Sequence, residues 1–198
     1  MLTRRKQPNV KYLDQLSNTI QADQLRMTAL KAAQALELPD CWIAAGFIRN
    51  YIWDQVFESE LPPVKSDIDV IYFDPGDTRQ KSEKEIEGLL QSQQPICSEK
   101  LGSWSVKNQA RMHHVNRDRP YQNCQDAMAH WPETVTAIAG RLTSRDELEV
   151  LAPFGLDDIY NGIVRPTPHF KQYKLFEFKI RQDRKKWSDR WPDLDIQI

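Results

Sequence analysis

The chain has 198 residues and a net charge of −1, and hydrophobic residues make up 40% of it. These values fit one domain with a substantial core and give no overall basic field for a long nucleic-acid ligand. Its basic start is followed by polar residues, no run is apolar enough to span a membrane, and the three cysteines lie far apart without a CxxC pair. We therefore expect a cytoplasmic protein with no membrane partner, no disulfide-linked partner and no zinc site.

The first third of the chain predicts a helical lead-in followed by a strand, a tight turn and a helix. Apolar residues recur at helical spacing over residues 11–38. CWIAA (41–45) is a short apolar run typical of a buried strand. Gly46 follows directly, and residues 47–56 carry one apolar helical face.

A second strand and a surface helix are expected next. IDVIYF (68–73) is apolar and rich in β-branched residues, and the turn sequence DPGD ends it. Residues 79–92 predict a solvated amphipathic helix, and the apolar residues within 101–112 indicate a third strand.

The rest of the chain completes an α+β pattern. We expect a polar loop from His113, a short helix over 125–131, a hairpin formed by TVTAIAGRL and ELEVLAPF, a helix at LDDIYNGIV, and a basic C-terminal helix over 170–190. Residues 1–198 are thus expected to form one domain, with a helical lead-in at 11–38, a core at 41–168 and a helical C-terminal tail.

Two carboxylates open the second strand. Side chains alternate along a strand, so Asp67 and Asp69 project to one side while Ile68 and Val70 enter the core. Crowded carboxylates resist ionisation unless a cation compensates, and Mg²⁺ (or Mn²⁺) prefers oxygen ligands that include substrate phosphates. We expect Asp67 and Asp69 to bind a metal and to be catalytic; a polar strand edge is the alternative interpretation.

The glycine turn predicts an anion site upstream of the carboxylates. A glycine at Gly46 lets backbone amides approach a phosphate, and the N-terminus of the following helix favours negative charge. Arg49 lies in the first turn and could hold a triphosphate with its planar fork, and Ser66 directly precedes the carboxylate pair. Taken alone, these residues are also compatible with an ordinary tight turn and a surface charge.

Combined motifs indicate a family. AGFIRN (45–50) resembles the GG-x-VRD motif of tRNA CCA-adding enzymes and bacterial poly(A) polymerases, and SDIDVIYFD (66–74) resembles their DxD strand. LEVLAPFGLDDIYNGIVRPTP (148–168) is similar to their DPFGG-x-xDL-x-x-G-x-xR segment, with matches at Phe154, Gly155, Asp158, Gly162 and Arg165. WSVKNQARMH (104–113) and WPETVTAIAGRL (131–142) occupy the places of the third catalytic strand and the RRDFTINA block. The chain resembles small bacterial nucleotidyltransferase-like proteins of the DNA polymerase β superfamily.

This resemblance runs from about residue 25 to the C-terminus and implies a polymerase β-type fold, a small mixed sheet with flanking helices. It implies transfer of a nucleoside monophosphate from an NTP to an acceptor (RNA, protein or a small molecule), with release of pyrophosphate. Asp67 and Asp69 would bind the metal, and Asn108 and Arg111 would face the nucleotide. CCA addition itself is disfavoured, because the chain lacks the long helical body with which such enzymes hold tRNA.

The third carboxylate of this superfamily is not evident in the sequence. Ser105 stands where the CCA-adding enzymes carry an acid, and Glu99, Asp118 or Glu133 would have to fold into range. This departure keeps open an alternative, a catalytically impaired nucleotide-binding module with a regulatory or interaction role. A DxD-dependent phosphohydrolase is a third possibility, which the glycine turn does not support. The basic tail could dock acceptor phosphates, but its interleaved acids favour a solvated helix.

Overall fold

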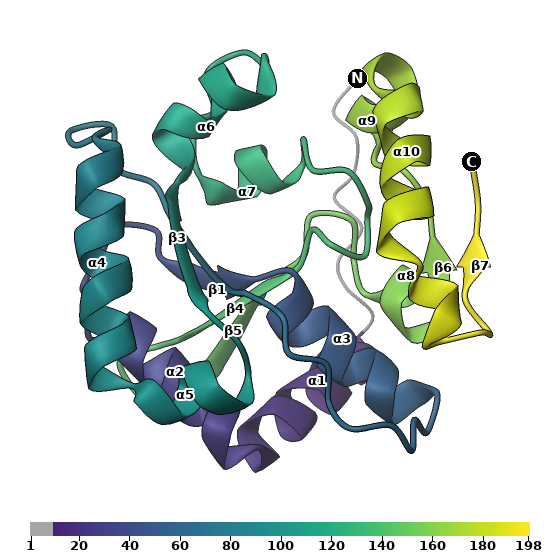
Figure 1. The fold of residues 1–198 in the computed structure, drawn as a ribbon, viewed down its shortest axis with the longest axis horizontal. Coiled ribbons are helices and arrows are strands. Elements are labelled where there is room, and N and C mark those ends of the chain that lie inside the picture. The colour runs from purple at the N-terminus through teal and green to yellow at the C-terminus, as the bar shows by residue number, and fades with distance from the viewer. Residues whose placement is uncertain (1–9) are drawn as a thin grey trace.

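The structure is a computed structural model that describes residues 10–198 (Figure 1). The helices in this part of the chain are α1 (Val10–Ala22), α2 (Gln24–Gln34), α3 (Gly46–Val56), α4 (Gln80–Gln93), α5 (Pro95–Lys100), α6 (Gln109–Asn116), α7 (Cys124–Met128), α8 (Asp157–Tyr160), α9 (Pro168–Tyr173) and α10 (Leu175–Lys185), with a 3-10 turn at Trp187–Asp189. The strands are β1 (Trp42–Ala44), β2 (Ile68–Tyr72), β3 (Trp104–Asn108), β4 (Ala139–Leu142), β5 (Leu148–Leu151), β6 (Ile163–Val164) and β7 (Asp195–Ile196). Within residues 10–198, no helix is long and apolar enough to cross a membrane.

A five-stranded mixed sheet in the order β3-β2-β1-β4-β5 forms the centre of the molecule. β2 and β3 pair in parallel, while β1 pairs antiparallel with both β2 and β4, and β4 with β5. β6 and β7 form a separate parallel pair. The expected α+β fold, a small mixed sheet with flanking helices and a helical C-terminal tail, is confirmed.

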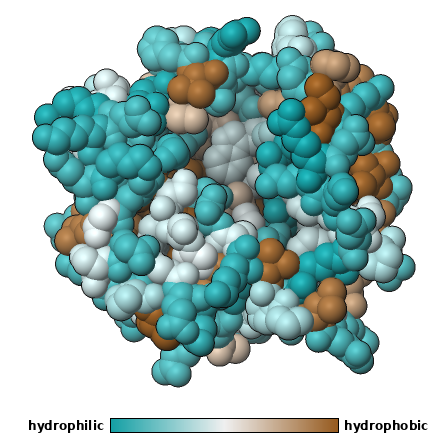
Figure 2. All heavy atoms as spheres, viewed as in Figure 1, coloured by the Kyte–Doolittle hydropathy of each residue, from teal (hydrophilic) through white to brown (hydrophobic). Residues whose placement is uncertain are grey.

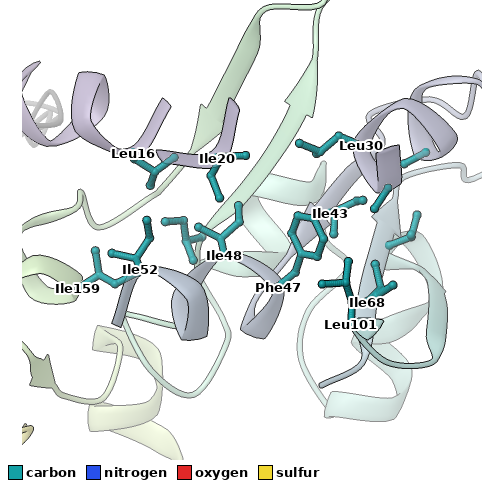
Figure 3. Packing of buried hydrophobic residues seen from close by; sticks show 14 of the residues in the cluster. Leu16, Ile20, Leu30, Ile43, Phe47, Ile48, Ile52, Ile68, Leu101 and Ile159 are labelled. Atoms are coloured by element: carbon teal, nitrogen blue, oxygen red, sulfur yellow. The ribbon is translucent and has the colours of Figure 1, made fainter. Parts of the chain in front are cut away.

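The larger core fills one face of the sheet, where α1, α2 and α3 pack. Leu16 of α1, Leu30 of α2 and Ile52 of α3 are at most 1% exposed and meet strand residues such as Ile68 (Figure 3). The opposite face has a smaller cluster built around Trp42, Ala44 and Ile71. Because side chains alternate along a strand, buried Ile68 and Val70 direct Asp69 toward this second, less covered face.

Three segments differ from the sequence interpretation. β3 ends at Asn108, whose side chain accepts a hydrogen bond from the amide of Ala110 and so starts α6, where a longer strand and then a loop were expected. The expected strand over TVTAIAGRL shortens to β4, because turn hydrogen bonds to the carbonyl of Glu133 hold the residues before it. LDDIYNGIV divides into α8 and β6 at Gly162, where φ is +66°.

The C-terminal tail packs against the domain instead of projecting into solvent. It forms α9 and α10 rather than one helix over 170–190, and the chain then turns back onto α3. The rings of Trp187 and Trp191 lie 5.3 and 5.0 Å from the ring of Trp53. Arg190 also donates hydrogen bonds to Asp54 of α3. Most of α10 is exposed, as expected for a solvated helix, whereas Trp187 and Trp191 are buried and anchor the tail.

Candidate active site

A cleft with two chambers lies over the second face of the sheet (Figure 2). The larger chamber lies between α6 and α10, and the smaller between α3 and α10. The larger chamber measures about 630 Å³ and has apolar walls that include Ile71, Met112, Trp131 and Phe170; we call it the apolar chamber. The smaller measures about 490 Å³. It is lined by Gly46, Ser66, Asp67 and several cations, and we call it the basic chamber. Both chambers share Ala45, Asp69, Thr136, Arg181 and Lys185.

Asp69 lies where the two chambers meet. Its neighbours in register are Ala44 on β1 and Ser105 on β3. Burial, followed by repulsion from Asp67, raises the pKa of Asp69 from its ordinary value of 3.8 to about 6. A hydrogen bond with Ser105 and the charges of Arg49 and Lys185 oppose this rise. The site thus holds a carboxylate that is costly to ionise unless a further cation is present.

The donor set suits a divalent oxygen-seeking cation. Asp67, exposed just before β2, and Asp69 both line the basic chamber and present only oxygen ligands. The raised pKa of Asp69 is a physical reason for a cation to bind there. Within residues 10–198, no group of three or more His, Cys, Asp or Glu side chains is arranged to hold a metal ion. The fit therefore rests on the pair alone.

The three candidates for a further carboxylate lie outside both chambers. Glu99 is exposed and paired with its neighbour Lys100. Asp118 accepts a hydrogen bond from Lys174 at 2.6 Å, and Glu133 is fully buried and accepts one from Arg181 at 2.6 Å. Ser105, not an acid, is the polar side chain next to Asp69 on the neighbouring strand.

The turn between β1 and α3 brings Gly46 against Ser66. A Cβ atom placed on Gly46 would lie only 3.1 Å from the hydroxyl oxygen of Ser66, so the small residue allows the close approach. Ala45, just before it, has φ 58° and ψ −123°, a backbone conformation that residues other than glycine rarely adopt. Strained backbone of this kind is concentrated at functional sites.

Replacing Ala45 with glycine is expected to stabilise the protein by about 1 kcal/mol, because relief of the strained φ outweighs the added freedom of the unfolded chain. Urea unfolding measures the change. Ala44→Gly, one residue earlier in β1, is the matched control and should destabilise, since it loses a buried methyl group from regular strand. A destabilised Ala45→Gly variant would show that the turn is not strained.

Arg49 lies inside the protein, 4% exposed, rather than as a free fork in the cleft. Its guanidinium donates to the hydroxyl of Thr136 at 2.7 Å and to the side-chain oxygen of Asn50 at 2.8 and 3.2 Å. It also lies 4.3 Å from the ring centre of Trp187. Burial lowers the pKa of Arg49 to about 10. The side chain contributes positive charge near Asp69, and each of its three nitrogens already donates one hydrogen bond within the protein.

Asn108 and Arg111 do not line either chamber. The side chain of Asn108 is fully buried; it accepts from the amide of Asp74 and donates to the carbonyls of Asp74 and Asp77. Arg111 donates to the buried carboxylate of Glu83. The structure therefore brings the predicted site residues of the basic chamber together and leaves two outside it. Those inside are Gly46, Arg49, Ser66, Asp67 and Asp69, and those outside are Asn108 and Arg111.

Residues from the C-terminal tail complete the cleft, and the sequence interpretation missed them. Arg181 and Lys185 of α10 line both chambers, and Lys186 lines the basic one. The basic composition of this helix was the only feature of the sequence that could have indicated them. It was not sufficient, because the position of the helix next to the carboxylates depends on tertiary packing. Asp158, one of the residues that match the family segment, lies outside both chambers and accepts hydrogen bonds from Thr134 and Arg165.

Comparison with known proteins identifies the class to which this fold and site belong. A nucleotidyltransferase family profile matches residues 31–196, and the chain belongs to that family. A search of curated proteins finds no significant match.

Solved structures are similar to the chain over most of its length. One, described as an NMR structure that reveals a CCA-adding enzyme head domain, is 33% identical with a TM-score of 0.80, over 93% of this chain and 95% of that one. A CCA-adding enzyme with CTP is 14% identical, with a TM-score of 0.51 over 97% of this chain and 44% of the enzyme. The Thermotoga maritima CCA-adding enzyme complexed with tRNA is 16% identical, with a TM-score of 0.52 over 100% and 41%. The chain spans less than half of these two enzymes, and the likeness to them shows the fold alone.

Proposed function

We propose that the protein transfers a nucleoside monophosphate from an NTP to an acceptor and releases pyrophosphate, in a reaction that depends on Mg²⁺ or Mn²⁺. The observation that carries the proposal is the partly buried carboxylate of Asp69, with its raised pKa, beside Asp67 in a cleft. Such a pair is costly to maintain without a cation, and the chain belongs to a nucleotidyltransferase family.

Asp67 and Asp69 would bind the metal. When bound, the metal lowers the pKa of an attacking hydroxyl and stabilises negative charge on the leaving oxygen. The protein contributes the orientation of its ligands: Ser105 hydrogen-bonds to Asp69, and β1 and β3 flank it on both sides. Arg49, a largely buried residue that lines the basic chamber, adds a fixed positive charge that favours the ionised carboxylate.

The basic chamber suits the triphosphate. Gly46 and Ser66 line this chamber, and α3 begins there with the positive end of its dipole. The apolar chamber, on the other side of Asp69, has the size and the aromatic walls of a site for a nucleoside or an acceptor group. CTP and tRNA occur in the complexes of similar CCA-adding enzymes. This supports an NTP here and keeps RNA among the acceptors, with proteins and small molecules.

A transfer assay tests this proposal. The protein is incubated with each of the four NTPs labelled at the α-phosphate, with Mg²⁺ or Mn²⁺, and with a panel of RNA, protein and small-molecule acceptors. We expect pyrophosphate release together with label on an acceptor, and neither in the presence of a chelator. Release of inorganic phosphate instead of pyrophosphate would indicate a phosphohydrolase and contradict nucleotidyl transfer.

A second candidate function is a nucleotide-binding module with a regulatory or interaction role. The observation that favours it is Ser105, the neighbour of Asp69 at the position where the resemblance implies a third acid. Nucleotide binding that depends on metal, without pyrophosphate release across the whole acceptor panel, would support this candidate.

Adding a carboxylate at Ser105 is expected to strengthen metal binding. In the Ser105→Asp variant a third acid stands in register with Asp69, so Mg²⁺ should bind roughly tenfold more tightly, about 1.4 kcal/mol. Calorimetric titration with Mg²⁺ or Mn²⁺ measures the gain. Ser103→Asp, at an exposed position two residues earlier, is the control and should leave affinity unchanged. Equal affinities of wild type and Ser105→Asp would argue against metal binding by Asp67 and Asp69.

A further inference from the structure

Binding of a triphosphate in the basic chamber requires a cation whose donors are free to contact it, and Arg49 is not such a cation. Each of its three nitrogens already donates a hydrogen bond, to Thr136 or to Asn50, and the ring of Trp187 lies 4.3 Å from the guanidinium. Arg190, another cation of this chamber, donates to Asp54. These arginines support the walls of the chamber.

Lys185 is placed differently. It is the last residue of α10, lines both chambers and acts electrostatically on Asp69. Within residues 10–198 it forms no ion pair, whereas Arg181, one helical turn earlier, is held by the buried Glu133 at 2.6 Å. Burial, together with the nearby charges of Arg181 and Arg49, lowers the pKa of Lys185, as expected for an ammonium group crowded by other cations.

The tail holds Lys185 at the junction of the chambers. Lys186 adopts a left-handed conformation, with φ 48°, that ends α10. Trp187 is buried, 7% exposed; it contacts the guanidinium of Arg49 and meets the ring of Trp53 edge to face. Because this anchor lies two residues from Lys185, the end of the helix cannot move away from the carboxylates without unpacking Trp187.

We propose that Lys185 is a catalytic residue that binds the polyphosphate of the NTP where the two chambers meet. This inference rests on the proposed function. The bond between the α- and β-phosphates has to break close to the metal-binding carboxylates, and Asp69 lies at this junction. The leaving pyrophosphate gains negative charge as the bond to the α-phosphate breaks, and a fixed ammonium beside it stabilises that charge. The C-terminal tail is thereby part of the active site.

Lys185→Met tests the assignment, with inorganic tripolyphosphate and ATP as the probes. Loss of a charged hydrogen bond should weaken tripolyphosphate binding about 10- to 100-fold and lower the rate of pyrophosphate release. Lys185→Arg keeps the charge and should restore most of the affinity. Arg184→Met is the matched control: it removes an exposed cation from the preceding position, outside both chambers, and should change neither quantity.

The outcomes separate this inference from the proposed function. Weaker tripolyphosphate binding by Lys185→Met, in a protein that transfers nothing to any acceptor, supports the polyphosphate ligand and contradicts nucleotidyl transfer. Active transfer with unchanged binding and rate in Lys185→Met overturns the role of Lys185 alone. Absence of tripolyphosphate binding by the wild type, or an equal loss in Arg184→Met, also overturns it. Thermal unfolding of each variant confirms that the exposed substitutions leave the fold intact.

Discussion

The Asp69→Asn variant is expected to be more stable than the wild type in the absence of metal and to have lost nucleotidyl transfer. Burial and the neighbouring Asp67 raise the pKa of Asp69 from 3.8 to about 6, so the folded protein at neutral pH carries a carboxylate that it disfavours. The shift corresponds to about 2–3 kcal/mol, which asparagine avoids because it carries no charge. Asparagine also lacks the negative charge that the proposed site needs to bind the metal ion.

The gain in stability should depend on pH. A carboxyl group whose pKa is higher in the folded state favours folding below its unfolded pKa of 3.8, and this contribution is lost as the pH rises through about 6. The difference between Asp69→Asn and wild type should therefore be close to zero near pH 3.5, grow between pH 4 and 6, and stay constant above pH 7.

Urea unfolding across this pH range, with and without Mg²⁺, measures both effects. Mg²⁺ should stabilise the wild type and have no effect on Asp69→Asn, because ligand binding to the folded state alone adds to its stability. Asp67→Asn is the control: Asp67 is exposed, so the variant should lose transfer with a smaller gain in stability. Full pyrophosphate release by Asp69→Asn would defeat the assignment of this carboxylate, whatever its stability.

Replacing Gly102 with alanine is expected to give the largest loss of stability among the substitutions described. Gly102 has φ +139°, and a Cβ atom there would lie 2.0 Å from the carbonyl oxygen of Ser66. The residues on either side of Gly102 fix the backbone of the segment that carries Asp67. The carbonyl of Leu101 accepts a hydrogen bond from the amide of Ser66, and the carbonyl of Ser103 accepts one from the amide of Ile68. Strain and overlap together should cost about 3–5 kcal/mol.

Relief of this overlap would displace Ser66 and Asp67, so the soluble fraction of Gly102→Ala should also bind Mg²⁺ more weakly than the wild type. Gly88→Ala is the matched control. Gly88 lies in α4 with nothing within 4 Å of an added Cβ atom, and alanine there should stabilise the helix by about 0.5–1 kcal/mol. Urea midpoints compare the two, and an equal stability of Gly102→Ala and wild type would contradict the close approach.

Local patterns in the sequence were sufficient for the elements that carry the carboxylates. β1, Gly46 and α3 follow one another along the chain, and alternation along β2 directs Asp69 away from the core that buries Ile68 and Val70. Hydrophobic periodicity predicts which residues share a face of a strand or helix, because residues close in sequence follow the same regular backbone geometry. The lengths of β3 and β4 were harder to predict from the sequence, since a side-chain cap at Asn108 and turn hydrogen bonds to Glu133 compete with strand pairing.

The sequence by itself thus determined the α+β class, the strand with its two acids and the glycine bend beside it. Only the tertiary structure decided which cations of the C-terminal tail line the cleft. Arg49 becomes buried because Trp187, far along the chain, packs on it, and the same packing brings Lys185 to the chambers that Asp69 lines. Residue spacing does not predict such contacts, because they form when helices distant in sequence bury their side chains against one another.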